Sequence, residues 1–123
     1  MRRLLEDLGA AAPIVQAPMA GAGGAALAAA AMRGGALGSL PCAMLTPMQA
    51  LVQEAEVRDA ADGPLNLNFF CHTMPEAPDE TAWRELLAPY VAEEGVVPGP
   101  APPLRRPFDD AMCAVVEAAR PEV

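Results

Sequence analysis

Lysine is absent from this chain of 123 residues, and all eight of its basic residues are arginine. That absence excludes a Schiff-base lysine and the lysine of a Walker-type phosphate loop. Sixteen acidic residues give a formal net charge of −8, and arginines are paired only at Arg2–Arg3 and Arg105–Arg106. Nucleic acids are bound by clustered cations that displace counterions from phosphates, so we expect no nucleic-acid partner.

Cysteine is scarce, and long hydrophobic segments are missing. Cys42, Cys71 and Cys113 are odd in number and far apart, with no Cys-x-x-Cys pair, which predicts neither a disulfide framework nor a zinc or other metal site. The two N-terminal arginines are followed by an acidic pair where a signal peptide needs its apolar segment, and the alanine-rich run 25–32 is too short to span a bilayer. We therefore expect a cytoplasmic protein with reduced thiols and no membrane partner.

Aromatic residues make up only 4% of the chain, whereas 53% of its residues are hydrophobic and it holds 10 glycines and 14 prolines. This composition is typical of a globular domain with small side chains packed between its elements and many sharp turns. It favours a layered α/β fold.

Apolar patterns predict strands at 14–19, 37–40 and 65–70, the first of them buried on both faces, and a further strand that begins at 121–123. Helices are predicted between the strands and after them, at 24–32, 47–61, 79–94 and 108–119. Glycines 34 and 35 would end the first helix with a positive φ.

The helix at 47–61 carries the clearest local signals. Thr46 is its predicted N-cap, with Pro47 in the first turn and Gln49 closing a capping box. We expect a solvated acidic face on and just after this helix, at Glu54, Glu56, Asp59 and Asp62. Its buried stripe is predicted at Met48, Leu51, Val52 and Ala55.

An insertion is predicted over about residues 71–107, where Pro75 and Pro78 precede the helix 79–94 and a proline-rich loop follows it. Helical spacing puts Trp83, Leu86, Leu87, Tyr90 and Val91 on one face, which predicts core packing. Outside the insertion, strands and helices alternate. Such alternation requires right-handed parallel crossovers and predicts an α/β fold with sequential strands as neighbours.

The glycine-rich loop at 21–26 allows two interpretations. Gly21, Gly23 and Ala26 fit the G-x-G-x-x-G/A pattern of dinucleotide-binding domains, between a strand and a helix. That pattern also requires an acidic residue about 20 positions later to hold a ribose. No acid occurs between the glycines and Glu54. A Rossmann dehydrogenase therefore stays open as a hypothesis, but it ranks third, behind the two classes of function described below.

Three stretches carry a more specific signal: "QAPMAG", then "GGALGSL", then "LNLNFFCH". In this order they resemble the N-terminal part of the nitronate monooxygenases, formerly called 2-nitropropane dioxygenases, which are FMN-dependent TIM-barrel enzymes. The resemblance implies that residues 1–123 form the N-terminal part of a TIM (β/α)8 barrel, with about three β/α units and the start of a fourth strand. Since the chain ends where a buried strand begins, we expect a fragment of a larger barrel.

In the family the flavin lies against the "APM" segment, which implies cofactor contacts at Ala17, Pro18, Met19 and Ala20. Because Pro18 has no N–H, the amides of Met19 and Ala20 are the expected donors to flavin N5 or O4. The family pattern also assigns the second Asn of "NLN", Asn68, to the flavin. We expect these two segments to lie beside one another at the carboxyl ends of the strands.

The resemblance implies no catalytic residue within the chain, because the family's histidine base lies on the strand that begins with "PEV", beyond Val123. His72, the only histidine, is a candidate for the mouth of the site, with a structural role at a strand end as the alternative. Cys71 is predicted to be a buried neighbour rather than a nucleophile, since no cationic group or base is evident nearby.

The function implied for the full-length protein is oxidation of alkyl nitronates to carbonyl compounds and nitrite, with the nitronate and oxygen as small-molecule partners. This chain alone would then be inactive. Two alternatives stay open: a flavin-dependent reductase of the enoyl-thioester type, which shares the early motifs, and a non-catalytic interaction module that recruits another chain through an exposed sheet edge.

Overall fold

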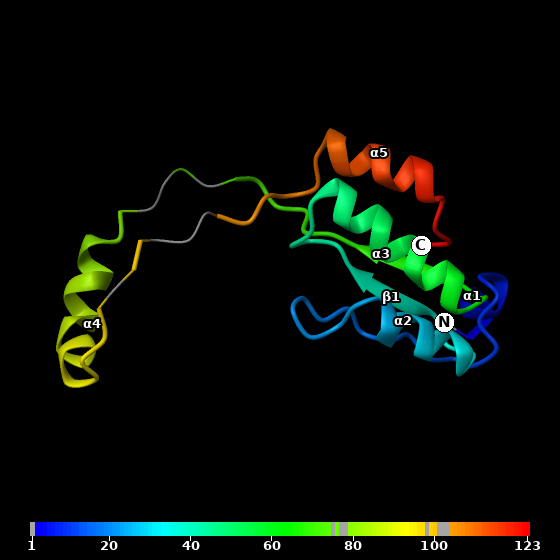
Figure 1. The fold of residues 1–123 in the computed structure, drawn as a ribbon, viewed down its shortest axis with the longest axis horizontal. Helices are drawn as coiled ribbons and strands as arrows, with labels where there is room; N and C mark the ends of the chain where they lie inside the picture. The colour runs from blue at the N-terminus through cyan, green and yellow to red at the C-terminus, as the bar shows by residue number, and fades with distance from the viewer. Residues whose placement is uncertain (1, 75, 77–78, 98, 101–103) are drawn as a thin grey trace. The chain divides into compact units, whose positions relative to one another are not determined.

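The computed structural model describes residues 2–74, 76, 79–97, 99–100 and 104–123. The chain divides into two units, one formed by residues 1–72 with 105–123 and the other by residues 73–104. No helix in the described ranges is both long and apolar enough to cross a membrane. The elements, in chain order, are α1 (Arg2–Asp7), α2 (Ala25–Arg33), β1 (Gly38–Pro41), α3 (Pro47–Ala60), β2 (Leu65–Asn68), α4 (Thr81–Glu93) and α5 (Asp110–Ala119) (Figure 1).

The first unit is built on parallel strands. Strands β1 and β2 pair in parallel, with Gly38 opposite Leu65 and Pro41 opposite Asn68. On the other side of β1, Val15 forms a parallel bridge with Leu37. The predicted α/β arrangement with sequential parallel neighbours is therefore confirmed for the strands that the structure describes.

The segment that begins with "PEV" lies along the far side of β2. The Val123 N–H donates to the Leu65 carbonyl at 3.3 Å, and the Leu67 N–H donates to the Val123 carbonyl at 3.0 Å. This alternation of donor and acceptor is the parallel pattern. The parallel order is thus 14–16, β1, β2 and Val123, as the alternation of elements predicts.

The first predicted strand is shorter and more exposed than expected. It forms only the bridge at Val15, and Ile14 and Val15 are 58% and 47% exposed, so the prediction of burial on both faces is wrong. The segment pairs on one side only, with β1, and Pro18 has no N–H to continue a ladder. Strand β2 likewise ends at Asn68, two residues before the predicted end.

Helices α2, α3 and α5 form the apolar layer of this unit, and α3 lies between the other two (Figure 1). Leu40 of β1 and Leu65 of β2 are fully buried against this layer. Helix α2 ends as predicted, with Gly35 at a φ of 82° just after it. The core is filled mainly by small or medium side chains: Ala28, Ala29, Met32, Leu40, Cys42, Ala50, Val57, Ala61, Leu65, Leu67 and Val115.

Helix α3 begins as predicted but buries a different face. Thr46 and Gln49 form the reciprocal capping box. The buried residues, however, are Ala50 and Val57, seven positions apart, whereas Met48 is 69% exposed. Residues seven apart share one helix face, and the small Ala50 lets that face approach the core. The stripe predicted at Met48, Leu51, Val52 and Ala55 is therefore wrong, with only Leu51 partly buried against the core.

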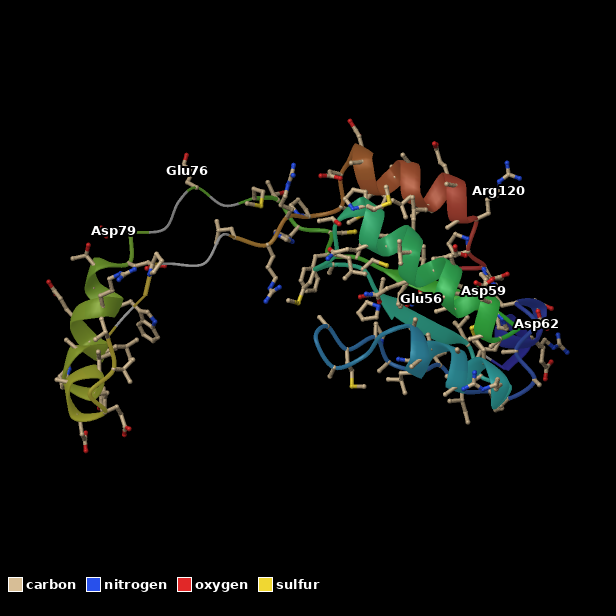
Figure 2. All side chains as sticks on the ribbon, viewed as in Figure 1. Glu56, Asp59, Asp62, Glu76, Asp79 and Arg120 are labelled. Atoms are coloured by element: carbon tan, nitrogen blue, oxygen red, sulfur yellow. The ribbon has the colours of Figure 1, made fainter. Side chains whose placement is uncertain are left out.

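The acidic face predicted on α3 is present in part. Glu56, Asp59 and Asp62 are exposed on α3 and just beyond it (Figure 2). Glu54 differs: it is half-buried and forms an ion pair with Arg58, with 3.1 Å between its Oε1 and the arginine Nε. Three carboxylates of the predicted face are therefore solvated, and the fourth forms an ion pair within the helix.

The unit formed by residues 73–104 falls inside the predicted insertion and contains α4. Its apolar stripe is exposed, with Trp83 and Tyr90 both at 63%, so the prediction of core packing is wrong. Within the described part of this unit α4 is the single helix, and a lone helix has no second layer to cover its apolar face. Pro75, Pro78 and residues 98 and 101–103 of the proline-rich loop lie outside the described residues.

Glu122 joins the C-terminal segment to α3 and β2 within the first unit. Its Oε2 accepts hydrogen bonds from the Leu65 N–H at 2.8 Å and from the Arg58 guanidinium at 3.0 Å. Partial burial acts to raise the pKa of Glu122, but these hydrogen bonds outweigh it and leave the pKa lowered. Arg58 also donates to the Gly63 carbonyl at 3.0 Å, so one arginine joins α3, the turn before β2 and the C-terminal segment.

Candidate functional site

The candidate site lies at the carboxyl edge of the parallel strands, where the segments after residue 16, after β1 and after β2 emerge together. The two predicted flavin-contacting segments, Ala17–Ala20 and Asn68, share this edge but are not neighbours, because β1 lies between them. Two strand spacings separate them by about 10 Å. The expectation of direct neighbours is thus corrected: the end of β1, at Pro41, contributes to the same edge.

The Met19–Gly23 segment forms a tight turn. The Met19 carbonyl accepts hydrogen bonds from the N–H groups of Ala22 at 3.1 Å and Gly23 at 2.6 Å, and Gly21 has a φ of 80°. A Cβ at Gly23 would lie 3.2 Å from the Met19 carbonyl oxygen, so the turn requires a small residue there. The glycine-rich loop therefore shapes the backbone of the "APM" segment.

The amide groups expected to contact a flavin are available. In the described part of the chain, the N–H groups of Met19 and Ala20 donate to no acceptor, and both residues are exposed. Ala17 is exposed and Pro18 half-buried. Two unused donors on neighbouring residues, flanked by small side chains, can approach a flat ring closely.

Asn68 offers a third free polar group. Its backbone carbonyl accepts from the Cys42 N–H at 2.8 Å, but among the described residues its side-chain amide has no hydrogen-bond partner. The residue is half-buried and lines an open cavity of about 310 Å³ with Leu67, Phe69 and Phe108. An amide with both a donor and an acceptor free is suited to bind the polar edge of a ligand.

Asn66 differs from Asn68 because it is already engaged. Its Nδ2 donates to Ser39 Oγ at 3.1 Å, and the Ser39 N–H donates to Gln16 Oε1 at 2.7 Å. Gln16 Nε2 in turn donates to the Ala17 carbonyl at 2.5 Å. Neither Gln16 nor Ser39 was predicted to take part in the site. Alternation along a strand does not relate Ser39 to Asn66, because only the register of β1 and β2 brings the two residues together.

His72 lies after β2 with its ring exposed. Its Nε2 is 3.1 Å from the Arg105 carbonyl, and its ring centroid is 6.2 Å from that of Phe70. Because a carbonyl only accepts hydrogen bonds, this contact places the proton on Nε2. His72 is therefore tied to the backbone that leads into α5, and no described group near it forms a proton relay.

The cysteines are arranged differently from the prediction. Cys71 is exposed, so its expected burial is wrong; the chain has already left the sheet at Asn68. Cys42, after β1, is the buried one. Burial raises the pKa of its thiol to about 11, against a smaller opposite effect of a hydrogen bond from the backbone of Asn68. A thiol held in its neutral form is a packing residue.

A second cavity, of about 170 Å³, lies beside the starts of α3 and α5. The Phe69 and Phe108 rings meet edge to face in its wall, with centroids 4.9 Å apart. Asp109 caps α5 there by accepting from the Met112 N–H at 3.0 Å, so its carboxylate is engaged in helix capping. Among the described residues, no three His, Cys, Asp or Glu side chains gather as a metal site would need.

The family model of the nitronate monooxygenases matches residues 2–119. The chain is 41% identical to a nitronate monooxygenase of Paraburkholderia phytofirmans, over 79% of this chain and 27% of that protein. It is also 41% identical to a nitronate monooxygenase of Pseudomonas aeruginosa, over 78% of this chain and 28% of that protein. The matched part thus spans little more than a quarter of the length of these relatives.

Solved structures give the same picture. A nitroalkane oxidase from Streptomyces ansochromogenes is similar with a TM-score of 0.73 and 32% identity, over 92% of this chain and 32% of that chain. FabK from Thermotoga maritima is similar with a TM-score of 0.54 and 28% identity, over 78% of this chain and 28% of that chain. Since the family match extends over nearly the whole sequence, the chain belongs to the nitronate monooxygenase family.

Proposed function

We propose that this chain forms the first flavin-facing strands of an FMN-dependent TIM barrel, and that the complete protein oxidises alkyl nitronates to carbonyl compounds and nitrite with oxygen. Membership of the nitronate monooxygenase family supports this activity. The observation that carries the proposal is a set of polar groups at the carboxyl edge that have no hydrogen-bond partner among the described residues: the amides of Met19 and Ala20, and the side chain of Asn68.

The residues at this edge fit a flavin. A flavin ring presents acceptors at N5 and O4 along one edge, and the two free amides of the Met19 turn are donors of the matching kind. Ala17 and Ala20 leave room for a flat ring, and Asn68 can pair with either a donor or an acceptor. When bound, FMN supplies the redox chemistry, accepting electrons from the substrate carbanion and passing them to oxygen.

The chain's own residues bind and orient the cofactor in this account. The backbone amides stabilise negative charge near N5 and O4, because oriented N–H dipoles favour it. Asn68 would hold the polar edge of the flavin through its side-chain amide. The single histidine, His72, is held through Nε2 at the Arg105 carbonyl. We propose that the proton-accepting group comes from another part of the barrel and that this chain alone is inactive.

A chimera tests the proposed function. This chain replaces the matching quarter of the Pseudomonas aeruginosa nitronate monooxygenase, and the purified protein is assayed for bound FMN and for oxygen uptake with an alkyl nitronate. We expect a yellow protein that consumes oxygen. A folded chimera that is colourless and inert contradicts the proposal, and one that consumes NADH with an enoyl thioester favours the reductase alternative.

Within that chimera, Asn68→Ala is expected to weaken FMN binding by about two- to tenfold, the range that the loss of one hydrogen bond gives. The matched control is Gln53→Ala, which removes a side-chain amide from α3. A titration followed by flavin fluorescence measures both dissociation constants. Equal constants for the two variants would remove Asn68 from the cofactor site.

The interaction module is kept as a second candidate because Ile14 and Val15 are exposed. Among the described residues, their segment pairs with the chain at Leu37 on one side and has no strand on the other. Sedimentation of the chain distinguishes the two: a discrete dimer or hetero-complex favours the module. The dinucleotide hypothesis has less support, since β1 ends at Pro41 and is followed by Cys42 instead of by an acid that could hold a ribose.

A further inference from the structure

We propose that Gln16 is a positioning residue, which Ser39 and Asn66 anchor across the sheet and which holds the Ala17–Ala20 segment in the shape that receives the flavin. The inference rests on the proposed function in one respect: the segment that Gln16 holds is the one we assign to the cofactor. Gln16, Ser39 and Asn66 would not touch the flavin in this role.

Asn66, Ser39 and Gln16 are linked by hydrogen bonds in which Ser39 takes part through both its hydroxyl and its backbone N–H. Asn66 Nδ2 donates to Ser39 Oγ at 3.1 Å, the Ser39 N–H donates to Gln16 Oε1 at 2.7 Å, and Gln16 Nε2 donates to the Ala17 carbonyl at 2.5 Å. These bonds join β2, β1 and the first segment in order. They end on the residue at which the candidate cofactor segment begins.

The strand register shows on which face of the sheet these hydrogen bonds lie. A Cβ at Gly38 would lie 2.7 Å from the Ala28 carbonyl, so that side of β1 faces α2. Strand alternation puts Ser39 on the opposite side, and its register partner Asn66 lies there with it. The same alternation puts Asn68 on the side of Asn66. The hydrogen-bonded residues Ser39 and Asn66 therefore share one face of the sheet with Asn68, the residue we assign to the cofactor.

Burial makes this chain of hydrogen bonds specific. Ser39 is 0% exposed and is the single buried polar side chain among the described residues. Buried polar groups are almost always paired, because an unpaired one loses its hydration without compensation. The Ser39 N–H donates to Gln16 and the Ser39 hydroxyl accepts from Asn66, so these two partners pair two polar groups of the buried residue.

The Ala17–Ala20 segment has few other restraints. The isolated bridge joins Val15 to Leu37, just before β1, and Pro18 has no N–H. Within the described part of the chain, the amides of Met19 and Ala20 donate to no acceptor. The Met19 turn holds the far end of the segment, and Gln16 holds the near end. A side chain that donates to the Ala17 carbonyl and accepts from the neighbouring strand therefore fixes where the segment leaves the sheet.

The test uses the whole chain labelled with ¹⁵N and compares Gln16→Met, Gln16→Glu and the control Gln53→Met. In Gln16→Met both hydrogen bonds are lost, so the amide signals of Ser39, Ala17, Met19 and Ala20 should move and the last three should broaden. Gln16→Glu keeps an acceptor for Ser39 but no donor for Ala17, so the Ser39 signal should return towards its wild-type position.

The signals of Leu40 and Leu65 report whether the core is intact, and the control should leave all of these signals in place. Unchanged signals over 17–20 in Gln16→Met, with the core intact, overturn the positioning role. If Gln16→Met does not fold, Gln16→Glu is used in its place. Its Ala17, Met19 and Ala20 signals must then shift while the Ser39 signal stays in place. A shifted Ser39 signal with unchanged Ala17, Met19 and Ala20 signals would overturn the positioning role.

An FMN titration of the same proteins separates this inference from the proposed function. We expect Gln16→Met to weaken FMN binding by about three- to tenfold relative to Gln53→Met, because the flavin would then have to order the segment. Equal affinities, with the 17–20 signals shifted, overturn the link between the segment and the cofactor. If the wild-type chain shows no FMN binding even at saturating ligand, the proposed function fails for this chain, and the amide signals alone decide the role of Gln16.

Discussion

At the scale of single residues, Gly38 shows how closely β1 and α2 approach. A Cβ built there would lie 2.7 Å from the Ala28 carbonyl oxygen and 2.8 Å from Met32 Cγ. Met32 could turn away, but the backbone carbonyl of a helix cannot. The "GGALGSL" motif therefore contains a glycine that the packing of strand on helix demands.

We predict that Gly38→Ala destabilises the chain by about 1–3 kcal/mol, the range for overpacking a tight core. Urea unfolding followed by circular dichroism measures the change. The control is Gly99→Ala, where an added Cβ would meet nothing within 4 Å and a change of less than about 0.5 kcal/mol is expected. Two variants of equal stability would show that α2 does not constrain this position.

At the scale of elements, α3 depends on its first turn. The Gln49 N–H donates to Thr46 Oγ at 3.3 Å, and the Thr46 N–H donates to Gln49 Oε1 at 2.9 Å. Thr46→Ala removes the side-chain acceptor and should cost about 1 kcal/mol of unfolding free energy. Thr46→Ser keeps the hydroxyl and should recover most of that loss. A serine variant as unstable as the alanine one would point to the lost methyl group instead of the cap.

The attachment of the C-terminal segment should depend on pH through Glu122. Its folded pKa is lowered, so its contribution to stability is fully present above the unfolded value of about 4.3 and is lost as pH falls through the lower folded pKa. Partial burial acts to lower the pKa of Arg58, but its bonds to Glu122 and Glu54 outweigh this and raise it. The arginine thus stays charged throughout the acid range.

We therefore predict that Glu122→Gln lowers the urea midpoint at neutral pH. As the pH falls below the unfolded value of about 4.3, its midpoint should fall less than that of the wild type, which loses the contribution of the ionised carboxylate. Glu117→Gln, on the exposed surface of α5, is the matched control. Parallel pH profiles for Glu122→Gln and the wild type would exclude this carboxylate as the source of the acid sensitivity.

The sequence was a good guide wherever local chemistry decides the structure. The capping box at Thr46 and Gln49 and the positive φ of Gly35 depend on residues close in the chain, and both were predicted. The third predicted strand likewise begins at Leu65, as β2 does. The predictions failed where distant elements decide: which face of α3 is buried depends on its neighbours, and the exposure of Val15 depends on what pairs beside it.

The same distinction applies to the candidate site. The motifs predict cofactor contacts in the "APM" segment and at Asn68, but the position of β1 between them is a property of the sheet order. Gln16 and Ser39 were overlooked because each is unremarkable until the register brings Ser39 opposite Asn66. The exposure of Trp83 and Tyr90 on α4 likewise depends on what surrounds that helix, which helical spacing alone does not tell.

At the scale of the whole molecule, the account depends on parallel strands that present free polar groups at one edge. The free amides of Met19 and Ala20 and the side chain of Asn68 come from segments almost fifty residues apart in sequence, and only the parallel order brings them to the same edge. A barrel contributes further strands to such an edge, so we expect FMN to bind this chain more weakly than it binds the chimera.

The most direct test is an FMN titration of the ¹⁵N-labelled chain, read at single residues. We predict that the backbone amides of Met19 and Ala20 and the side-chain amide of Asn68 shift together along one binding curve, while the indole N–H of Trp83 on α4 stays in place. If FMN at saturating concentration moves none of these three groups, or moves them no more than it moves Trp83, the proposed cofactor edge is contradicted.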